Sequence, residues 1–219
     1  MKSGSRSLAE LYDGRAAAFG RDVRASGYFC RQSFDQRYEK ITELLRSADQ
    51  KQILDVGCGP GLFSARLALK NRVVGIDLSH QMLRLAGRDL NAVQGDAFSL
   101  PFQNHSFDVV MSIEVLQHLS KPECFLKEMA RVTKSGGQMI LSSLNDASLL
   151  HRLLKPVGGY DSLYFHPLSP IRTIFENEGF KNFETHFLGF PFPWTWNGNG
   201  QENWRLPFAT SWIIRCMKT

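Results

Sequence analysis

Apolar residues follow two periodicities along this chain, and the two alternate after residue 50. Short runs of β-branched and aliphatic residues are typical of strands that are covered on both faces. Such runs occur at 53–56, 72–76, 93–97, 107–110, 138–142, 181–188 and 210–217. Between several of them, apolar positions spaced three and four residues apart predict amphipathic helices. The alternation predicts an α/β fold built on a largely parallel sheet.

The sequence also indicates where some of these helices begin and end. Ser79 precedes a helical pattern, which its hydroxyl can cap, and Gly87 can end the same helix. Ser120-x-x-Glu123 forms a capping box in front of the next strongly amphipathic segment. We therefore expect one helix to begin after Ser79 and another after Ser120.

The most informative motif lies where the first predicted strand ends. After Val56 the chain reads Gly57-Cys58-Gly59-Pro60-Gly61 and continues into a helical pattern. Glycines lack a Cβ atom, so the backbone can turn sharply and a ligand can lie directly against it. The N-terminus of the following helix leaves free N–H groups at the same point. A strand, a glycine turn and a helix in this order predict a site for a nucleotide-like ligand.

Two acidic residues follow the next two strands. Asp77 ends the second strand, 20 residues after Gly57, which is about where an acid meets the ribose hydroxyls in a βαβ unit. Asp96 ends a short third strand, where a carboxylate can accept a hydrogen bond from an exocyclic amine such as that of adenine. The alternatives are structural, since Asp77 can be a helix cap and Asp96 a turn residue.

Four ordered motifs together resemble the class I S-adenosylmethionine (SAM) dependent methyltransferases, close to the subgroup of ubiquinone- and menaquinone-biosynthesis methyltransferases. The motifs are LDVGCGPG at 54–61, VGIDLS at 74–79, GDAFSLPF at 95–102 and SFDVV at 106–110. Four motifs in order over residues 50–142 are more specific than one glycine turn. The resemblance implies a Rossmann-like sandwich with a mostly parallel seven-stranded sheet and helices on both faces. It also implies SAM as cofactor and S-adenosylhomocysteine as product.

The resemblance further implies which residues hold the methionine part of the cofactor. Asp55 would orient the glycine turn and hold the amino group, directly or through water. Gly57 and Gly59 would let their backbone approach the cofactor, and Cys58 between them fits as a small packing residue. Ile113, just past the fourth strand, would offer its carbonyl oxygen. We do not expect Cys58 to act as a nucleophile, because no neighbour in sequence would lower its pKa.

For the adenosine part, the same resemblance implies a second set of residues. Asp77 would bind the ribose hydroxyls, while Leu78 and Met82 would pack on the adenine. Asp96 would accept a hydrogen bond from the adenine amino group, and the Ala97 N–H would reach a ring nitrogen.

A candidate catalytic base follows the fourth strand. Glu114 and His118 are four residues apart, so they share a face if this turn is helical. Some quinone-pathway relatives carry Glu-x-x-Glu-His here and bind a divalent metal. In this chain Gln117 replaces the second acid, so we expect no metal. We assign His118 as the candidate base, the alternative being an ordinary helix-surface residue; the weaker candidates are His151, Tyr160, Tyr164 and His166.

The chain divides into three regions of one methyltransferase domain over 1–219. Residues 1–48 are a helical lid region, 49–142 the SAM-binding core, and 143–219 a substrate-side insertion with the last two strands. Tyr12 and Tyr28 in the lid region are expected to close over SAM, the alternative being packed aromatics. The last region is rich in aromatic residues: Phe183, Phe187, Phe190, Phe192, Trp194, Trp196, Trp204, Phe208 and Trp212. They indicate a substrate wall, a hairpin that pads the sheet edge, or an exposed dimer or membrane-surface patch.

Composition and charge narrow the function further. A chain of 219 residues that is 43% hydrophobic can bury one core, which predicts a single domain. No apolar run is long enough to span a bilayer, and the first residues lack the apolar stretch of a signal peptide. The four cysteines are scattered, so reduced thiols and a cytoplasmic location are expected. The net charge of +5 is dispersed, and basic residues of 15–46 are interpreted as a solvated helical face.

We therefore expect an enzyme that transfers a methyl group from SAM to a small, apolar or aromatic acceptor. The acceptor atom, O, C or N, stays open. A nucleic-acid partner is not expected, and the protein would be a monomer or a homodimer. Two alternatives remain: an RNA or protein methyltransferase, and a non-catalytic SAM-binding protein.

Overall fold

The chain alternates between strands and helices as its apolar pattern predicts. The structure is a computed structural model that describes residues 3–28, 31–45, 49–87, 90–154, 163–189, 195–197 and 209–219. The helices are α1 (Ser3–Phe19), α2 (Arg31–Leu44), α3 (Ser64–Leu67), α4 (His80–Ala86), α5 (Glu123–Val132), α6 (Leu149–Leu154) and α7 (Leu168–Asn177), with a 3₁₀ turn, η2, at Leu116–His118. The strands are β1 (Gln52–Val56), β2 (Arg72–Asp77), β3 (Asn91–Gln94), β4 (Phe107–Ile113), β5 (Thr133–Leu144), β6 (Phe180–Gly189), β7 (Thr195–Asn197) and β8 (Ala209–Lys218).

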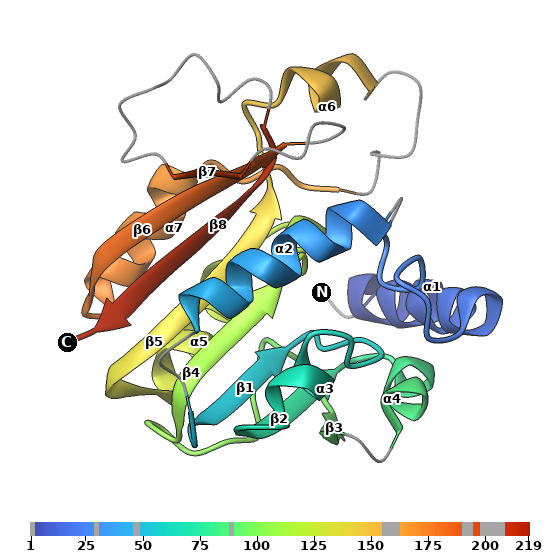
Figure 1. Cartoon of the computed structure of the whole chain (residues 1–219), viewed down its shortest axis with the longest axis horizontal. Coiled ribbons are helices and arrows are strands. Elements are labelled where there is room, and N and C mark those ends of the chain that lie inside the picture. The colour runs from blue at the N-terminus through green and yellow to red at the C-terminus, as the bar shows by residue number, and fades with distance from the viewer. Residues whose placement is uncertain are drawn as a thin grey trace.

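All of these strands form one twisted sheet in the order β3-β2-β1-β4-β5-β8-β6-β7 (Figure 1). The first five pair in parallel, and β8 inserts antiparallel between β5 and β6. The predicted mostly parallel, seven-stranded Rossmann-like sheet is confirmed, and the three-residue β7 adds a short edge strand. The strand order reverses at β1, which lies between β2 and β4, and this switch point is where α/β proteins bind ligands.

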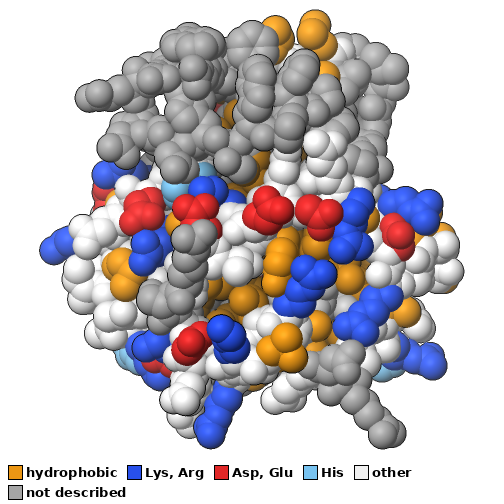
Figure 2. Space-filling model, viewed as in Figure 1, with side chains coloured by type: hydrophobic (Ala, Val, Ile, Leu, Met, Phe, Trp, Pro, Cys, Tyr) orange, Lys and Arg blue, Asp and Glu red, His pale blue; other side chains and the backbone are white. Residues whose placement is uncertain are grey.

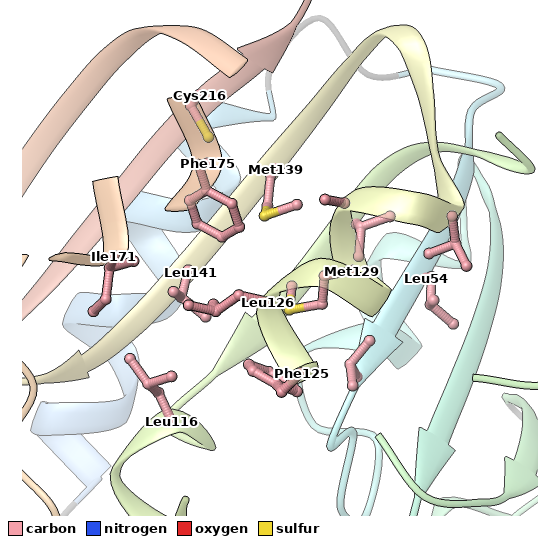
Figure 3. Packing of buried hydrophobic residues seen from close by; sticks show 14 of the residues in the cluster. Leu54, Leu116, Phe125, Leu126, Met129, Met139, Leu141, Ile171, Phe175 and Cys216 are labelled. Carbon is pink, nitrogen blue, oxygen red and sulfur yellow. The ribbon is translucent and has the colours of Figure 1, made fainter. Parts of the chain in front are cut away.

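Helices cover both faces of the sheet (Figure 1). The sheet therefore separates two main apolar clusters, one under the helices of each face. On one face, α5 and α7 bury Phe125, Leu126 and Phe175 against the strands, and Figure 3 shows these side chains interlocking with Met139 and Leu141 of β5. On the other face, α2, α3 and α4 cover the sheet; α3 packs on β2, and α4 packs on β2 and β3. This two-sided burial explains why the β1 and β4 sequences are almost continuously apolar.

One of the two predicted helix starts is confirmed and one is wrong. The Ser79 hydroxyl accepts a hydrogen bond from the Met82 N–H, and Gly87 ends α4 with a positive φ of 68°. The capping box at Ser120 does not form, because α5 begins only at Glu123, after Pro122, with no side-chain cap. Proline lacks an N–H and favours a helix start by its fixed φ, which moves the helix start past Ser120.

The prediction of a solvated basic face over 15–46 is wrong for part of α2. Arg37 and Lys40 are 5% and 4% exposed, since they share the inward face of α2 with Phe34, Ile41 and Leu44. Arg21, Arg24 and Arg31, by contrast, are exposed, as the prediction requires. On the face seen in Figure 2, acidic and basic side chains are interspersed.

The aromatic stretch is described only in part. Phe183 and Phe187 of β6 pack against the core, and Trp212 of β8 is completely buried in it. The antiparallel pairing of β6 with β7 agrees with the hairpin alternative for these residues. Phe190, Phe192, Trp194, Trp204 and Phe208 lie outside the described residues, as does the side chain of Trp196. Within the described residues, no helix has the length and apolarity that crossing a membrane requires.

Candidate functional site

A cavity of about 820 Å³ lies at the carboxyl ends of the parallel strands. Its walls come from the residues that directly follow β1, β2, β3 and β4, and from the N-terminal region that covers them. All twelve predicted site residues line it: Tyr28, Asp55, Gly57, Cys58, Gly59, Asp77, Leu78, Met82, Asp96, Ala97, Ile113 and His118. Motifs that are far apart in sequence therefore meet in one place, because parallel strands end at a common edge.

The glycine turn forms the floor of the cavity and is tied to the end of β2. The N–H groups of Gly57 and Cys58 donate to the Ile76 carbonyl, at 2.7 and 3.1 Å. Gly57 has a φ of 78°, and a Cβ on it would lie 2.2 Å from the Val115 side chain, so only glycine fits. Gly75 lies so close to Cys58 that a Cβ there would be 2.6 Å from the thiol sulfur. Burial raises the pKa of Cys58, consistent with a packing role.

Two buried carboxylates face the cavity without a cationic partner among the described residues. Burial raises the pKa of Asp55 to about 7, although the Ser64 hydroxyl donates to its carboxylate and lowers it. Burial also raises the pKa of Asp77, which accepts from the Gly59 N–H at 2.8 Å and the Ser79 N–H at 2.9 Å. The negative charge of Asp77 also raises the pKa of Asp55, so the floor is suited to a positively charged ligand.

The adenosine side of the cavity combines apolar and polar groups. Met82 is completely buried, in a small cluster with Ala16 and Ala25 from the N-terminal region. Asp96 is exposed, and its carboxylate accepts from the Phe98 N–H at 2.9 Å, which fixes the turn after β3. Asp96 is therefore a turn residue, as the structural alternative had it. Its carboxylate still has free lone pairs that can accept a hydrogen bond from a second donor.

Helix α1 forms the roof of the cavity by contacting both of its walls. Asp13 accepts hydrogen bonds from the Ser79 hydroxyl and, at 3.2 Å, from the Gln81 N–H at the start of α4. On the opposite wall, the Tyr12 hydroxyl lies 2.8 Å from His118 Nε2. The expectation that Tyr12 lies over the site agrees with this placement, since Tyr12 lines the cavity.

Tyr28 lines the cavity from the segment after α1. It is 8% exposed, and its hydroxyl has no hydrogen-bond partner among the described residues. Its ring packs edge-on against Phe34 and under the guanidinium of Arg37, 5.4 Å from the ring centre. A buried hydroxyl without a partner is unfavourable, so this group is available to a ligand.

Glu114 is held by a network that the sequence does not reveal. Arg37 donates to its carboxylate at 3.0 Å, and Ser142 and Gln117 donate to it at 3.0 and 3.2 Å. Glu114 also has a φ of 60°, which is strained for a non-glycine residue and needs such support. The only signal for Arg37 was its helical spacing from Phe34, which places it on the buried face of α2.

His118 ends the short turn η2 and points to α1. The predicted helical turn includes only Leu116–His118, so Glu114 and His118 have separate partners although both line the cavity. Burial lowers the pKa of His118 to about 4, so the imidazole is neutral at pH 7. Burial raises the pKa of Tyr12 to about 12, which keeps its hydroxyl protonated. The pair is therefore an uncharged hydrogen bond at the cavity wall.

Comparison with known proteins agrees with this geometry. A family model described as a methyltransferase domain matches residues 54–141. Over nearly its whole length the fold matches a SAM-dependent methyltransferase of Thermotoga maritima, described as a possible histamine N-methyltransferase. The TM-score is 0.71 at 21% identity, covering 97% of this chain and 100% of that one. Residues 54–141 thus match the methyltransferase-domain family, and the whole chain shares the fold of a SAM-dependent methyltransferase.

Relatives of this methyltransferase domain have several stated activities. A malonyl-[acyl-carrier protein] O-methyltransferase of Erwinia pyrifoliae is 38% identical over 138 residues, covering 61% of this chain and 52% of that protein. A ubiquinone biosynthesis O-methyltransferase of Idiomarina loihiensis is 37% identical over 107 residues, covering 43% of each. The structure of magnesium protoporphyrin IX methyltransferase from Synechocystis, with bound S-adenosylhomocysteine, matches with a TM-score of 0.68 at 18% identity, covering 96% and 94%. The chain spans about half the length of the curated relatives it matches.

Proposed function

We propose that this protein transfers the methyl group of SAM to a small acceptor bound in the cavity. The observation that carries the proposal is the pair of buried carboxylates, Asp55 and Asp77, which line the cavity and have no ion-pair partner among the described residues. SAM carries an ammonium and a sulfonium, and such charges would compensate two acids that are otherwise costly to ionise. The glycine turn and the cavity volume also suit a nucleoside.

The residues lining the cavity divide into roles along the cofactor. Asp55 would hold the amino group, while Gly57 and Gly59 would give the methionine part a close approach to the backbone. Ile113 and Tyr28 would complete this end through a carbonyl oxygen and a buried hydroxyl. These roles are those that the family resemblance implies, and the fact that each group lines the cavity supports them.

At the other end, Asp77 would accept from the ribose hydroxyls, which suits a carboxylate at the end of β2. Leu78 and Met82 would pack on the adenine, and Asp96 and the Ala97 N–H would recognise its edge. The turn that Asp96 fixes after β3 presents both groups to the cavity.

When bound, SAM supplies a methyl group on a sulfonium that is its own leaving group. The protein then mainly has to align the acceptor atom with the methyl carbon, and positioning supplies roughly 7–11 kcal/mol. His118 is the proposed base for an acceptor that must lose a proton. With a pKa of about 4 and a bond to Tyr12, however, it is a weak base. This favours acceptors that need no base, such as a carboxylate, and the malonyl-directed O-methyltransferase relatives support the same choice.

The first test is calorimetric titration of the protein with SAM, S-adenosylhomocysteine and NAD. We expect micromolar binding of the first two and none of NAD, because the glycine spacing and the buried acids suit a sulfur nucleoside that carries an ammonium group. Radiolabelled SAM with a panel of carboxylate, phenol and amine acceptors then tests the transfer. Absence of SAM binding would contradict the proposal. SAM binding without methylation of any acceptor would favour the non-catalytic alternative.

A further inference from the structure

The turn after β3, which would recognise the adenine, lies at the surface of the protein. Asp96, Ala97 and Phe98 line the cavity, and all three are exposed or half-buried. Two local hydrogen bonds close the turn: the Phe98 N–H donates to the Asp96 carboxylate at 2.9 Å, and the Ser99 N–H donates to the Asp96 carbonyl oxygen at 3.1 Å. Local bonds of this kind fix the shape of a turn but not its place on the protein. That place depends on where the chain is held on either side of the turn.

The chain is held at one point before this turn and at another after it. Before it, the Gly95 N–H donates to the Asp77 carbonyl oxygen at 3.0 Å. After it, both backbone polar groups of Leu100 bind side chains of α5. The Leu100 N–H donates to Glu128 Oε2 at 2.8 Å, and its carbonyl oxygen accepts from Arg131 Nη2 at 2.9 Å. The side chain of Leu100 is also buried in the core, so this residue is the first fixed point after the turn.

Glu128 and Arg131 form a two-pronged ion pair that holds more of the loop than Leu100. Arg131 Nε lies 2.7 Å from Glu128 Oε1, and Arg131 Nη2 lies 2.8 Å from Glu128 Oε2. The pairing with Arg131 lowers the pKa of Glu128, which keeps the carboxylate ionised at neutral pH. Two parallel bonds fix the plane of the guanidinium. Its Nη1 is thereby directed at the loop, where it donates to the Phe102 carbonyl and to the Asn104 side chain, each at 2.8 Å.

We propose that Glu128 and Arg131 are positioning residues for adenine recognition, because they hold Leu100 and thereby place Asp96 and Ala97 against the edge of the base. The inference rests on the proposed function, in which Asp96 accepts from the adenine amino group and the Ala97 N–H donates to a ring nitrogen. A binding group acts precisely only when the residues around it hold it in place. Hydrogen bonds weaken steeply as their angle departs from linearity. A displaced turn should therefore lose its discrimination for the amino group before it loses the rest of the cofactor contacts.

Calorimetry with S-adenosylhomocysteine and S-inosylhomocysteine measures this discrimination, since the second ligand has a carbonyl oxygen in place of the amino group. For the natural protein we expect about ten- to hundred-fold tighter binding of S-adenosylhomocysteine, because the Asp96 carboxylate would meet an acceptor in the other ligand. Asp96→Ala should abolish this ratio. Arg131→Met, which keeps the apolar stem and removes every donor, should lower the ratio to roughly a fifth or less. Glu128→Gln, which keeps an oxygen for the Leu100 N–H, should lower it less.

A role in stability alone would weaken the binding of both ligands alike and leave their ratio unchanged. Lys134→Met is the matched control, because it removes an ion pair of similar exposure, with Asp108 at 2.9 Å, near the amino ends of β4 and β5. It should retain the ratio. In protein that already carries Asp96→Ala, Arg131→Met should not change the ratio further, since residues that act through one another are not additive. Thermal melting checks folding, and Arg131→Lys, which keeps the charge without the paired donors, replaces Arg131→Met if that variant does not fold.

The outcomes separate this inference from the proposed function. A folded Arg131 variant with the natural ratio, alongside an Asp96→Ala variant that has lost it, overturns the positioning role alone. Equal binding of the two ligands by the natural protein overturns the positioning role together with the assignment of Asp96, and leaves methyl transfer standing. Failure of the natural protein to bind either SAM or S-adenosylhomocysteine overturns the proposed function and this inference with it.

Discussion

Replacing Asp55 by asparagine isolates the buried charge on which the proposed cofactor site depends. Asp55 is 2% exposed, and burial raises its pKa from an ordinary 3.8 to about 7. Asparagine has the same shape and keeps an oxygen that can accept from Ser64. The variant therefore removes the ionisation with little change in packing.

The ligand-free protein should lose stability as the pH rises. Between pH 3.8 and about 7 the unfolded chain releases the Asp55 proton while the folded protein keeps it. The free energy of unfolding should therefore fall across this window, by on the order of 4 kcal/mol for a difference of about three pH units. Asp55→Asn should lack this contribution and be more stable than the natural protein at pH 8. Urea denaturation at several pH values measures both curves.

Cofactor binding should show the opposite dependence on pH. The SAM ammonium interacts with the ionised carboxylate, so affinity should fall about ten-fold for each pH unit below 7, and binding should release a proton. Asp55→Asn should bind SAM more weakly at pH 7.5, by roughly 1.5–3 kcal/mol, with a flatter profile. Calorimetry in two buffers of different ionisation enthalpy measures affinity and proton release together. A natural protein whose SAM affinity does not change from about pH 5 to 7, or an asparagine variant with the same slope, would refute the reasoning.

Three further predictions concern other positions in the cavity. Asp77→Ala should weaken SAM binding by roughly 1.5–3 kcal/mol in calorimetry, and unchanged affinity would rule out the ribose assignment. Gly57→Ala should lower the free energy of unfolding by roughly 2–4 kcal/mol in urea, because a left-handed φ and a 2.2 Å contact with Val115 both oppose a Cβ; a shift below 1 kcal/mol would contradict this. His118→Ala should lower turnover in the radiolabel assay for acceptors that must lose a proton, with SAM affinity nearly intact; equal turnover would exclude it as the base.

The sequence was sufficient for the parts of the site that one continuous segment encodes. The glycine turn, Asp77 and Asp96 each follow directly on a strand, and parallel strands end at a common edge, so their meeting could be predicted. Ser79 was also predictable as a helix cap, because a cap depends only on residues three positions apart in the sequence.

Contacts between distant segments could not be predicted in this way. Arg37 pairs with Glu114 across 77 residues of sequence, and Tyr12 meets His118 across 106. Such partners depend on where α1 and α2 pack on the sheet, and no local spacing encodes that placement. Only the position of Arg37 on the apolar face of α2 indicated that this charge is buried.

The insertion of β8 between β5 and β6 orders the events of folding on the ribosome. Of the three strands, β8 leaves the ribosome last, after both of its neighbours. Until then, β5 presents an unpaired edge, and β6 and β7 can pair only with each other. A lone two-stranded ribbon is marginally stable in water, and an open strand edge invites pairing with other chains. The nascent chain therefore has a vulnerable interval between the synthesis of β5 and that of β8, during which a chaperone would protect it most effectively.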